Sequence, residues 1–180
     1  MAAPVADAPA EATGVEHDRI RTRIRRARPE EAVALSDLAL RSKGLWGYDA
    51  AFMEACRISL SIDPEAVAAL PFNVLDEAGT ITGFYGLSGQ PHRGEIEFLF
   101  VDPEGVRRGR GRLLARHFLA LARRLGFDEL EVSADPFAEG FYAAMRAVSI
   151  GKVPSDAIPN RVVPRLRFSL IADRGAVPPV

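Results

Sequence analysis

The sequence predicts a single α+β domain in which seven strands alternate with helices. Its 180 residues suit one domain that buries a substantial core. Short segments rich in β-branched and aromatic residues indicate strands, and segments with apolar residues at helical spacing lie between them. No internal repeat relates these segments, which favours one layered structure with helices packed on a sheet. We place the strands at residues 22–27, 71–76, 80–88, 95–101, 128–134, 148–153 and 165–171.

We expect the folded domain to cover residues 19–172. Residues 1–18 are rich in Ala and Pro and show no periodicity, which predicts a disordered tail, and residues 173–180 are expected to be a loose C-terminal tail. No apolar run approaches membrane-spanning length, and the N-terminus lacks the layout of a secretory signal. These features favour a cytoplasmic protein without membrane contact.

Three helices are expected before the second strand, and they start near Pro29, Asp49 and Asp63. Pro suits a first helical turn, where its missing N–H has no acceptor anyway, and Asp accepts a hydrogen bond from a free N–H. The first helix should end at Lys43-Gly44 and the second near Leu60.

Two further helices are expected after the fourth strand. The first runs from about Gly109 to Leu125, and the second starts at Asp135-Pro136 and ends near Met145. A loop with three prolines, at positions 154, 159 and 164, should join the last two strands. The predicted buried stripe of the longer helix consists of Leu114, Phe118, Leu121 and Leu125.

The most informative stretch is 95–114, where a strand, a glycine turn and a helix start follow one another. Asp102-Pro103 ends the strand, because proline cannot donate to a β-ladder. Gly109 and Gly111 then lie at the helix start, where free N–H groups attract anions and glycine permits close approach. This order predicts an anion-binding turn.

Four arginines surround this turn, namely Arg107, Arg108, Arg110 and Arg112. Positive charge at a helix N-terminus opposes the dipole, so the pattern favours a bound anion over a solvated basic helix end. The net charge of −1 and the lack of an aromatic platform or second basic stripe argue against nucleic acid. The only cysteine, Cys56, lies on an apolar helix face and suits a core position, and no metal-ligand spacing is present.

Two motifs at this separation carry a family resemblance. The first is Val101-Asp102-Pro103 followed by Gly109-Arg110-Gly111 and a helix, and the second is the segment from Asp135 to Tyr142, which contains Ala138 and Phe141-Tyr142. Together they resemble the acetyl-CoA motif and the Asn/Asp-x-x-Ala-x-x-Phe-Tyr motif of the GCN5-related N-acetyltransferase (GNAT) superfamily. The resemblance covers roughly residues 22–171. It implies a mixed, mostly antiparallel sheet that splays between the fourth and fifth strands.

The chain departs from the family pattern at two positions. Val106 stands where many members carry Arg or Gln, and Arg107 or Arg108 would then compensate for that phosphate contact. Arg146 stands where the family usually has Gly. If position 146 requires a positive φ, Arg costs about 1 kcal/mol there.

The resemblance implies transfer of an acetyl group from acetyl-CoA to a primary amine of a small molecule or peptide, by direct attack in a ternary complex. A non-catalytic acyl-CoA-binding module with the same fold is the alternative. Monomer and homodimer both remain open. The implied cofactor-binding residues are Leu99, Val101, Arg107, Arg108, Gly109, Arg110, Gly111, Arg112 and Asp135.

Candidate catalytic groups lie in the central strand and in the last helix. Glu95 and Glu97 share one face by alternation, and Ile96, Phe98 and Phe100 should take the other face. A half-buried carboxylate has a raised pKa, which suits a general base, and the resemblance favours Glu97 for that role. Tyr142 matches the family's general acid. For the glutamates the alternatives are a structural ion pair or an exposed face, and for the tyrosine the alternative is a core position.

The acceptor pocket is expected between the first two helices and the late loop. Trp46, Tyr48 and Phe52 supply aromatic surface, and Glu95 is placed at the same site. The late loop adds Ser155, Asn160 and Arg161. A Trp–Tyr pair can equally plug the core, and the residues fit a small molecule or a peptide terminus.

Overall fold

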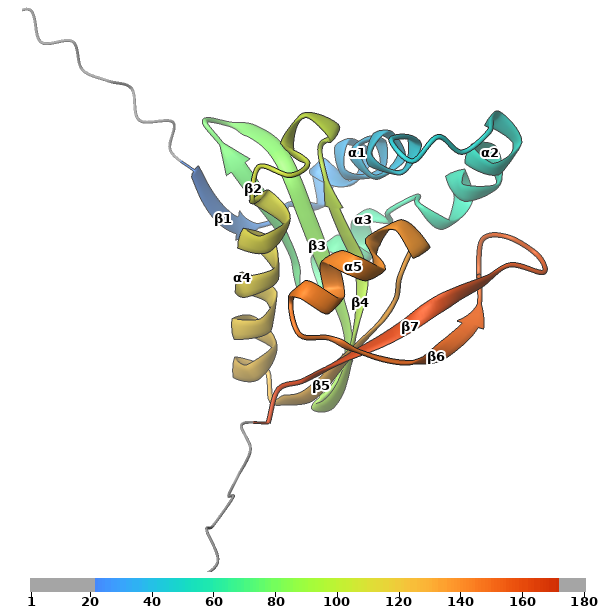
Figure 1. The fold of residues 1–180 in the computed structure, drawn as a ribbon. Helices are drawn as coiled ribbons and strands as arrows, with labels where there is room; N and C mark the ends of the chain where they lie inside the picture. Colours follow the sequence, from blue (N-terminus) through green and yellow to red (C-terminus); the bar gives the residue numbers. More distant parts are fainter. Residues whose placement is uncertain (1–21, 172–180) are drawn as a thin grey trace, which may run out of the picture.

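The computed structural model describes residues 22–171 as one seven-stranded sheet with helices on both faces (Figure 1). The strand order is β1-β2-β3-β4-β5-β7-β6, and all neighbours are antiparallel except β4 and β5, which are parallel. This arrangement confirms the predicted α+β class. The two expected tails lie outside the described residues. The strands are β1 (Thr22–Arg26), β2 (Phe72–Glu77), β3 (Thr80–Gln90), β4 (His92–Val101), β5 (Phe127–Ser133), β6 (Val148–Pro154) and β7 (Val162–Ser169).

The helices begin where the sequence supplies a cap. Asp49 accepts a hydrogen bond from the N–H of Phe52 at 2.8 Å, and Asp63 accepts one from the N–H of Glu65 at 2.8 Å. No helix described within residues 22–171 is long and apolar enough to cross a membrane. The α-helices are α1 (Ala32–Gly44), α2 (Ala50–Ser59), α3 (Pro64–Ala69), α4 (Arg110–Arg124) and α5 (Glu139–Ala144), and the 3-10 turns are η1 (Pro29–Glu31), η2 (Pro103–Gly105) and η3 (Pro136–Ala138).

Each face of the sheet has its own hydrophobic core. Helices α4 and α5 cover one face and α1, α2 and α3 cover the other (Figure 1). Cys56 is buried among apolar residues, which confirms its expected core position. The α4-side core includes Tyr85, Leu87, Leu114, Phe118, Leu130, Leu166 and Phe168. The α1-side core includes Leu35, Leu38, Cys56, Val67, Phe72, Val74 and Phe84.

Several sequence-based details are wrong. Pro154 is the last residue of β6 and does not lie in the loop that follows. The buried side of α4 consists of Leu114, Ala115, Phe118 and Ala122, whereas Leu125 is exposed because it lies beyond the last helical turn. Pro164 lies inside β7 and not in the preceding loop, because its carbonyl pairs with the N–H of Ala134 at 2.9 Å and needs no donor in return.

A β-bulge in β4 changes which side chains face which core. Leu87 pairs with Ile96, but the next β3 residue, Gly86, pairs with Phe98, so Glu97 is the extra residue. Ile96 therefore packs in the α4-side core while Phe98 and Phe100 pack against the α1-side core. The expectation that Ile96, Phe98 and Phe100 share a face is wrong, since the bulge shifts the alternation by one residue.

Strands β4 and β5 separate along their length, as the predicted splay requires. Their parallel pairing runs from His92 with Phe127 to Glu95 with Glu131. Beyond Glu95, β4 continues to Val101, and within residues 22–171 no strand pairs with that edge. Free backbone groups of β4 consequently line one side of an opening that the turn before α4 borders.

Candidate active site

The turn between β4 and α4 presents an array of free N–H groups. Arg107 has φ 63° and Gly109 has φ 84°, and these two left-handed residues turn the chain into the helix. Within the described chain, none of the N–H groups of residues 109–112 donates to a backbone carbonyl. With the dipole of a 15-residue helix behind it, this turn is suited to bind an anion.

Gly111 lets the first turn of α4 approach its neighbours. A Cβ at this position would lie 3.2 Å from a ring carbon of Phe141 and 3.8 Å from a methyl group of Val101. The glycine therefore has a packing reason in addition to the expected ligand contact, because it brings α4 against α5 and the end of β4.

The four arginines of the turn divide into two kinds. Arg110 is mostly buried and forms a bidentate ion pair with Glu77, with N···O distances of 3.1 and 2.5 Å. Arg107, Arg108 and Arg112 are exposed, and within residues 22–171 they make no ion pair. No local pattern in the sequence indicates the contact with Glu77, which lies 33 positions away. Three guanidinium groups thus remain available to an anionic ligand, while that of Arg110 is engaged by the β2–β3 hairpin.

Glu97 lies at the bulge, and its carboxylate accepts a hydrogen bond from the hydroxyl of Ser88. Its side chain is exposed, so it is not the half-buried carboxylate that alternation alone predicted. Glu97 lies on the side opposite the α4-side core that receives Ile96, as alternation requires, and the bulge leaves it without a partner residue on β3. An exposed carboxylate in hydrogen-bond contact with a neutral hydroxyl can still accept a proton.

Glu95 is paired with an arginine at the point where β4 and β5 begin to separate. Arg165 binds its two oxygens at 2.5 and 3.2 Å and also donates to Glu131 and to the hydroxyl of Ser133. The side chain of Glu95 is thereby held across β5 toward β7. Its expected place in the acceptor pocket remains a prediction.

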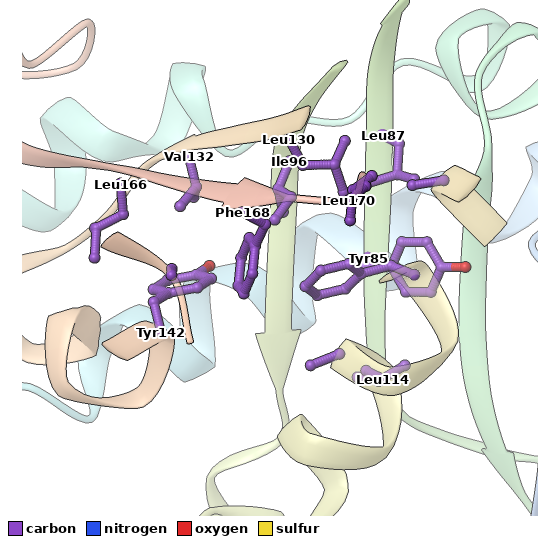
Figure 2. Packing of buried hydrophobic residues seen from close by; sticks show 14 of the residues in the cluster. Tyr85, Leu87, Ile96, Leu114, Leu130, Val132, Tyr142, Leu166, Phe168 and Leu170 are labelled. Carbon is purple, nitrogen blue, oxygen red and sulfur yellow. The ribbon is translucent and has the colours of Figure 1, made fainter. Parts of the chain in front are cut away.

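Tyr142 lies in the α4-side core, on the face that Leu99 and Val101 also border. It is only 5% exposed and packs against Phe168, as Figure 2 shows. Burial raises the pKa of the Tyr142 hydroxyl above its ordinary value, so the group keeps its proton at neutral pH. A protonated phenol in this position can donate a proton.

On the other face, four polar side chains converge from four segments, namely α1, the link between α1 and α2, the residues after β5, and the loop between β6 and β7. The carboxylate of Asp135 accepts hydrogen bonds from Lys43 Nζ at 2.5 Å and from the hydroxyl of Tyr48 at 2.9 Å, and it also caps η3 through the N–H of Phe137. Arg161 donates to the Tyr48 hydroxyl at 2.7 Å. Asp135, expected near the cofactor, thus lies with Tyr48 of the expected acceptor pocket. We name Lys43, Tyr48, Asp135 and Arg161 the polar cluster.

Sequence reasoning missed Lys43 as a member of the polar cluster. A lysine in the last turn of a helix already has an explanation in the helix dipole, and Asp135 is 92 positions away. Its contact with Asp135 follows only from the way α1 crosses the sheet.

Aromatic rings surround the polar cluster. Tyr48 stacks on Phe52 at a centroid distance of 3.9 Å, and Trp46 stacks on Phe137 at 5.2 Å with an interplanar angle of 6°. Trp46 is 37% exposed and Phe137 is 56% exposed, so this second pair forms surface and does not plug the core. Phe137 was not singled out from the sequence, although it follows the Asp135-Pro136 cap directly.

These features fit a donor that carries phosphates on a long flexible arm, as coenzyme A does. The free N–H groups at 109–112 and the three unpaired arginines suit phosphates. The unpaired edge of β4 from Ile96 to Val101 leads directly to that turn and suits an extended arm.

A sheet splayed between two parallel strands, with an anion-binding turn at the opening, defines an acetyltransferase of the GNAT class. The profile of the Acetyltransferase (GNAT) family matches residues 34–146, and the chain belongs to that family. A search of curated protein sequences finds no match to the chain.

Several solved structures share the fold of this chain. A GCN5-related N-acetyltransferase from Rhodopseudomonas palustris superimposes with a TM-score of 0.70 at 23% identity, covering 85% of this chain and 99% of that one. The PaiA N-acetyltransferase of Thermoplasma acidophilum, solved with coenzyme A, has a TM-score of 0.65 at 18% identity, covering 83% and 99%. YncA of Salmonella typhimurium, a putative acetyltransferase solved with acetyl-CoA, has a TM-score of 0.61 at 16% identity, covering 86% and 97%.

Proposed function

We propose that this protein transfers the acetyl group of acetyl-CoA to the primary amine of a small molecule or peptide. The observation that carries the proposal is the turn before α4, where free N–H groups and unpaired arginines border the open edge of β4. Two of the structural relatives were solved with coenzyme A or acetyl-CoA, which supports the choice of donor.

The N–H groups of residues 109–112, together with Arg107, Arg108 and Arg112, would hold the donor's phosphates. The backbone of Leu99 and Val101, on the unpaired edge of β4, would hold its arm and hydrogen-bond the thioester carbonyl. The donor supplies an activated acetyl thioester.

Glu97 would accept the proton of the attacking amine, directly or through a water, and the hydroxyl of Ser88 positions its carboxylate. Tyr142 would donate its proton to the departing thiolate, and burial in the α4-side core keeps its hydroxyl protonated until then. In the balance of the reaction a C–N bond forms and the C–S bond breaks. The amine proton passes to Glu97 and the Tyr142 proton passes to the thiolate, and proton exchange with solvent then restores both residues. Burial raises the pKa of the Cys56 thiol, which favours direct attack by the amine over an acyl-enzyme.

Paired variants test this function. Glu97→Gln and Tyr142→Phe should each lower kcat by about 100-fold with a panel of amines and leave acetyl-CoA affinity, measured by calorimetry, within a few-fold of the wild type. Ser88→Ala should lower kcat less, because it removes only the group that orients Glu97. Acetyl-CoA binding without turnover on any amine would instead favour the non-catalytic acyl-CoA-binding module. Unchanged turnover in both Glu97→Gln and Tyr142→Phe would rule out the roles of these residues as base and acid.

A further inference from the structure

The polar cluster contains more positive than negative charge in a partly enclosed place. Lys43 and Arg161 each lie within ion-pair distance of the single carboxylate of Asp135, with N···O distances of 2.5 and 3.6 Å. Their side chains are 15% and 18% exposed, and that of Asp135 is 11% exposed. Tyr48 adds no charge, because burial and the neighbouring Asp135 raise the pKa of its hydroxyl. The four groups together carry one unbalanced positive charge.

Arg161 has donors left over. Its Nη2 donates to the hydroxyl of Tyr48, and within residues 22–171 its Nε and Nη1 make no hydrogen bond. Both of these nitrogens remain accessible to solvent. Nη2 also has a second N–H, and this group forms a two-donor fork with the free nitrogen beside it, either Nε or Nη1. Such a fork, beside an excess positive charge, can bind a carboxylate in the bidentate manner.

The cluster lies across the opening between β4 and β5. Lys43 ends α1, which packs on β4, whereas Asp135 follows the end of β5. Arg161 belongs to the loop between β6 and β7, and that loop folds back so that Ala157 and Ile158 pack beside Phe52 against the α1-side core. Glu97 lies on this same side of the sheet, because it accepts a hydrogen bond from Ser88, the neighbour of Leu87, whose side chain enters the opposite core. The unbalanced charge and the proposed base therefore belong to one face.

We propose that Arg161 and Lys43 bind a carboxylate of the acceptor, so that the substrates are amines that also carry a carboxylate, such as amino acids. This inference rests on the proposed acetyl transfer, because it concerns the partner of that reaction. The exposed stack of Trp46 and Phe137 borders Tyr48 edge-on at 5.9 Å and offers a flat apolar surface to the remainder of the acceptor. Amino acids with large apolar side chains fit this combination best.

The charge of the cluster favours a carboxylate over other groups. One unbalanced positive charge matches a monoanion, whereas a phosphate ester near pH 7 carries close to two negative charges. A cationic polyamine would have to enter beside two cations and is disfavoured by repulsion. The ring centroids of Phe52 and Tyr48 lie 4.7 and 5.1 Å from Arg161 Cζ. These rings restrict access to the faces of the guanidinium and favour a partner that approaches in its plane.

Matched acceptors test the proposal. We would measure kcat/KM with acetyl-CoA for phenylalanine, phenylalaninamide and phenethylamine, and for the corresponding leucine series. We expect the free amino acids to be preferred by at least about 10-fold, the worth of one charge-assisted contact. The Arg161→Gln variant should reduce this preference to near unity through KM, while acetyl-CoA affinity stays unchanged. The acceptors differ in the pKa of their amines, and this difference affects the variant and the wild type equally when both are measured at one pH.

Controls separate recognition from structure. Arg57→Gln removes an exposed arginine of α2 that pairs only with Glu54, and it should leave the preference unchanged. Arg161→Lys keeps the charge without the fork and should retain part of the preference. A preference for the amide or amine over the acid, or an equal loss for all acceptors in Arg161→Gln, would overturn the inference.

A binding readout keeps the two proposals distinguishable. With coenzyme A present, N-acetylphenylalanine should bind by calorimetry at least about 10-fold more tightly than N-acetylphenylalaninamide, and Arg161→Gln should abolish that difference. Acid-selective binding without turnover would contradict acetyl transfer but retain the carboxylate site. Turnover of amines without acid selectivity in either assay would retain acetyl transfer and remove the carboxylate site.

Discussion

Two arginine-rich regions of this protein differ in whether their guanidinium groups form ion pairs with carboxylates. In β1, Arg25 binds Asp76 at 2.8 Å and both oxygens of Glu31 at 2.8 and 3.0 Å. At the turn before α4, Arg107, Arg108 and Arg112 have no ion-pair partner within residues 22–171. In the first region the arginine is paired with carboxylates of the protein itself, and these ion pairs stabilise the fold. The second leaves positive charge at a helix N-terminus, which is unfavourable until an anion binds.

The largest expected effect concerns the first region. Arg25→Met should lower the free energy of unfolding by about 3 kcal/mol, because it leaves two buried carboxylates without their shared partner. Urea unfolding at pH 7 measures this change. Arg23→Met is the matched control, since Arg23 binds the same Asp76 with a side chain that is 67% exposed, and it should cost less than about 1 kcal/mol. Equal losses in the two variants would contradict the assignment of Arg25 as the centre of the network.

The same network predicts how stability depends on pH. Hydrogen bonds from Arg25 lower the pKa of Glu31 to about 2 and the pKa of Asp76 to about 2. Because both values lie below those of the unfolded chain, the stabilisation is fully present above about pH 5 and is lost as pH falls toward 2. We expect each of the two groups to lose roughly 2 to 3 kcal/mol of stabilisation across that window in the wild type. Arg25→Met should flatten the slope, and a parallel pH profile in that variant would argue against the network as its source.

The next effect concerns the second region. Replacing Arg107, Arg108 and Arg112 together with Gln should weaken acetyl-CoA binding by about 20-fold, or nearly 2 kcal/mol, and reduce its dependence on salt. Arg110→Gln provides the contrast. It breaks the pair with Glu77, so it should lower stability by about 1 kcal/mol and change affinity little. Calorimetry at two salt concentrations and urea unfolding separate the two outcomes. Equal affinity losses for Arg110→Gln and the triple variant would mean that all four arginines contact the donor.

Local signals in the sequence were sufficient for the positions of the elements. Asp49 and Asp63 cap helices where expected, and the glycine turn leads into α4 as its motif implies. Such features depend on residues a few positions apart, so they can be read directly from the chain. The splay between β4 and β5 came from the pair of motifs, since no local pattern specifies where two parallel strands separate.

The site differs from the expectation wherever a distant residue decides the geometry. The bulge at Glu97 lies beside Gly86, where a Cβ would lie 2.8 Å from the ring of Phe72, and Phe98 packs against that same ring, so contacts with β2 determine which face Phe98 takes. The pairing of Arg110 with Glu77 spans 33 positions. Alternation and charge counts contain no information about contacts of this kind.

The smallest expected effect concerns a single backbone angle. Arg146 follows α5 with φ 72°, and its side chain is exposed. An L-residue is strained in this left-handed conformation, whereas glycine is not, although glycine loses more entropy on folding. Arg146→Gly should therefore raise the free energy of unfolding by about 0.5 to 1 kcal/mol.

Arg146→Ala separates backbone strain from the loss of the side chain. Alanine keeps the Cβ that causes the strain, so this variant should be no more stable than the wild type. Thermal unfolding of the three proteins provides the measurement. Stabilisation by alanine equal to that by glycine would assign the effect to removal of the arginine charge. A lower melting temperature for Arg146→Gly would show that the entropy of glycine outweighs the relief of strain at this position.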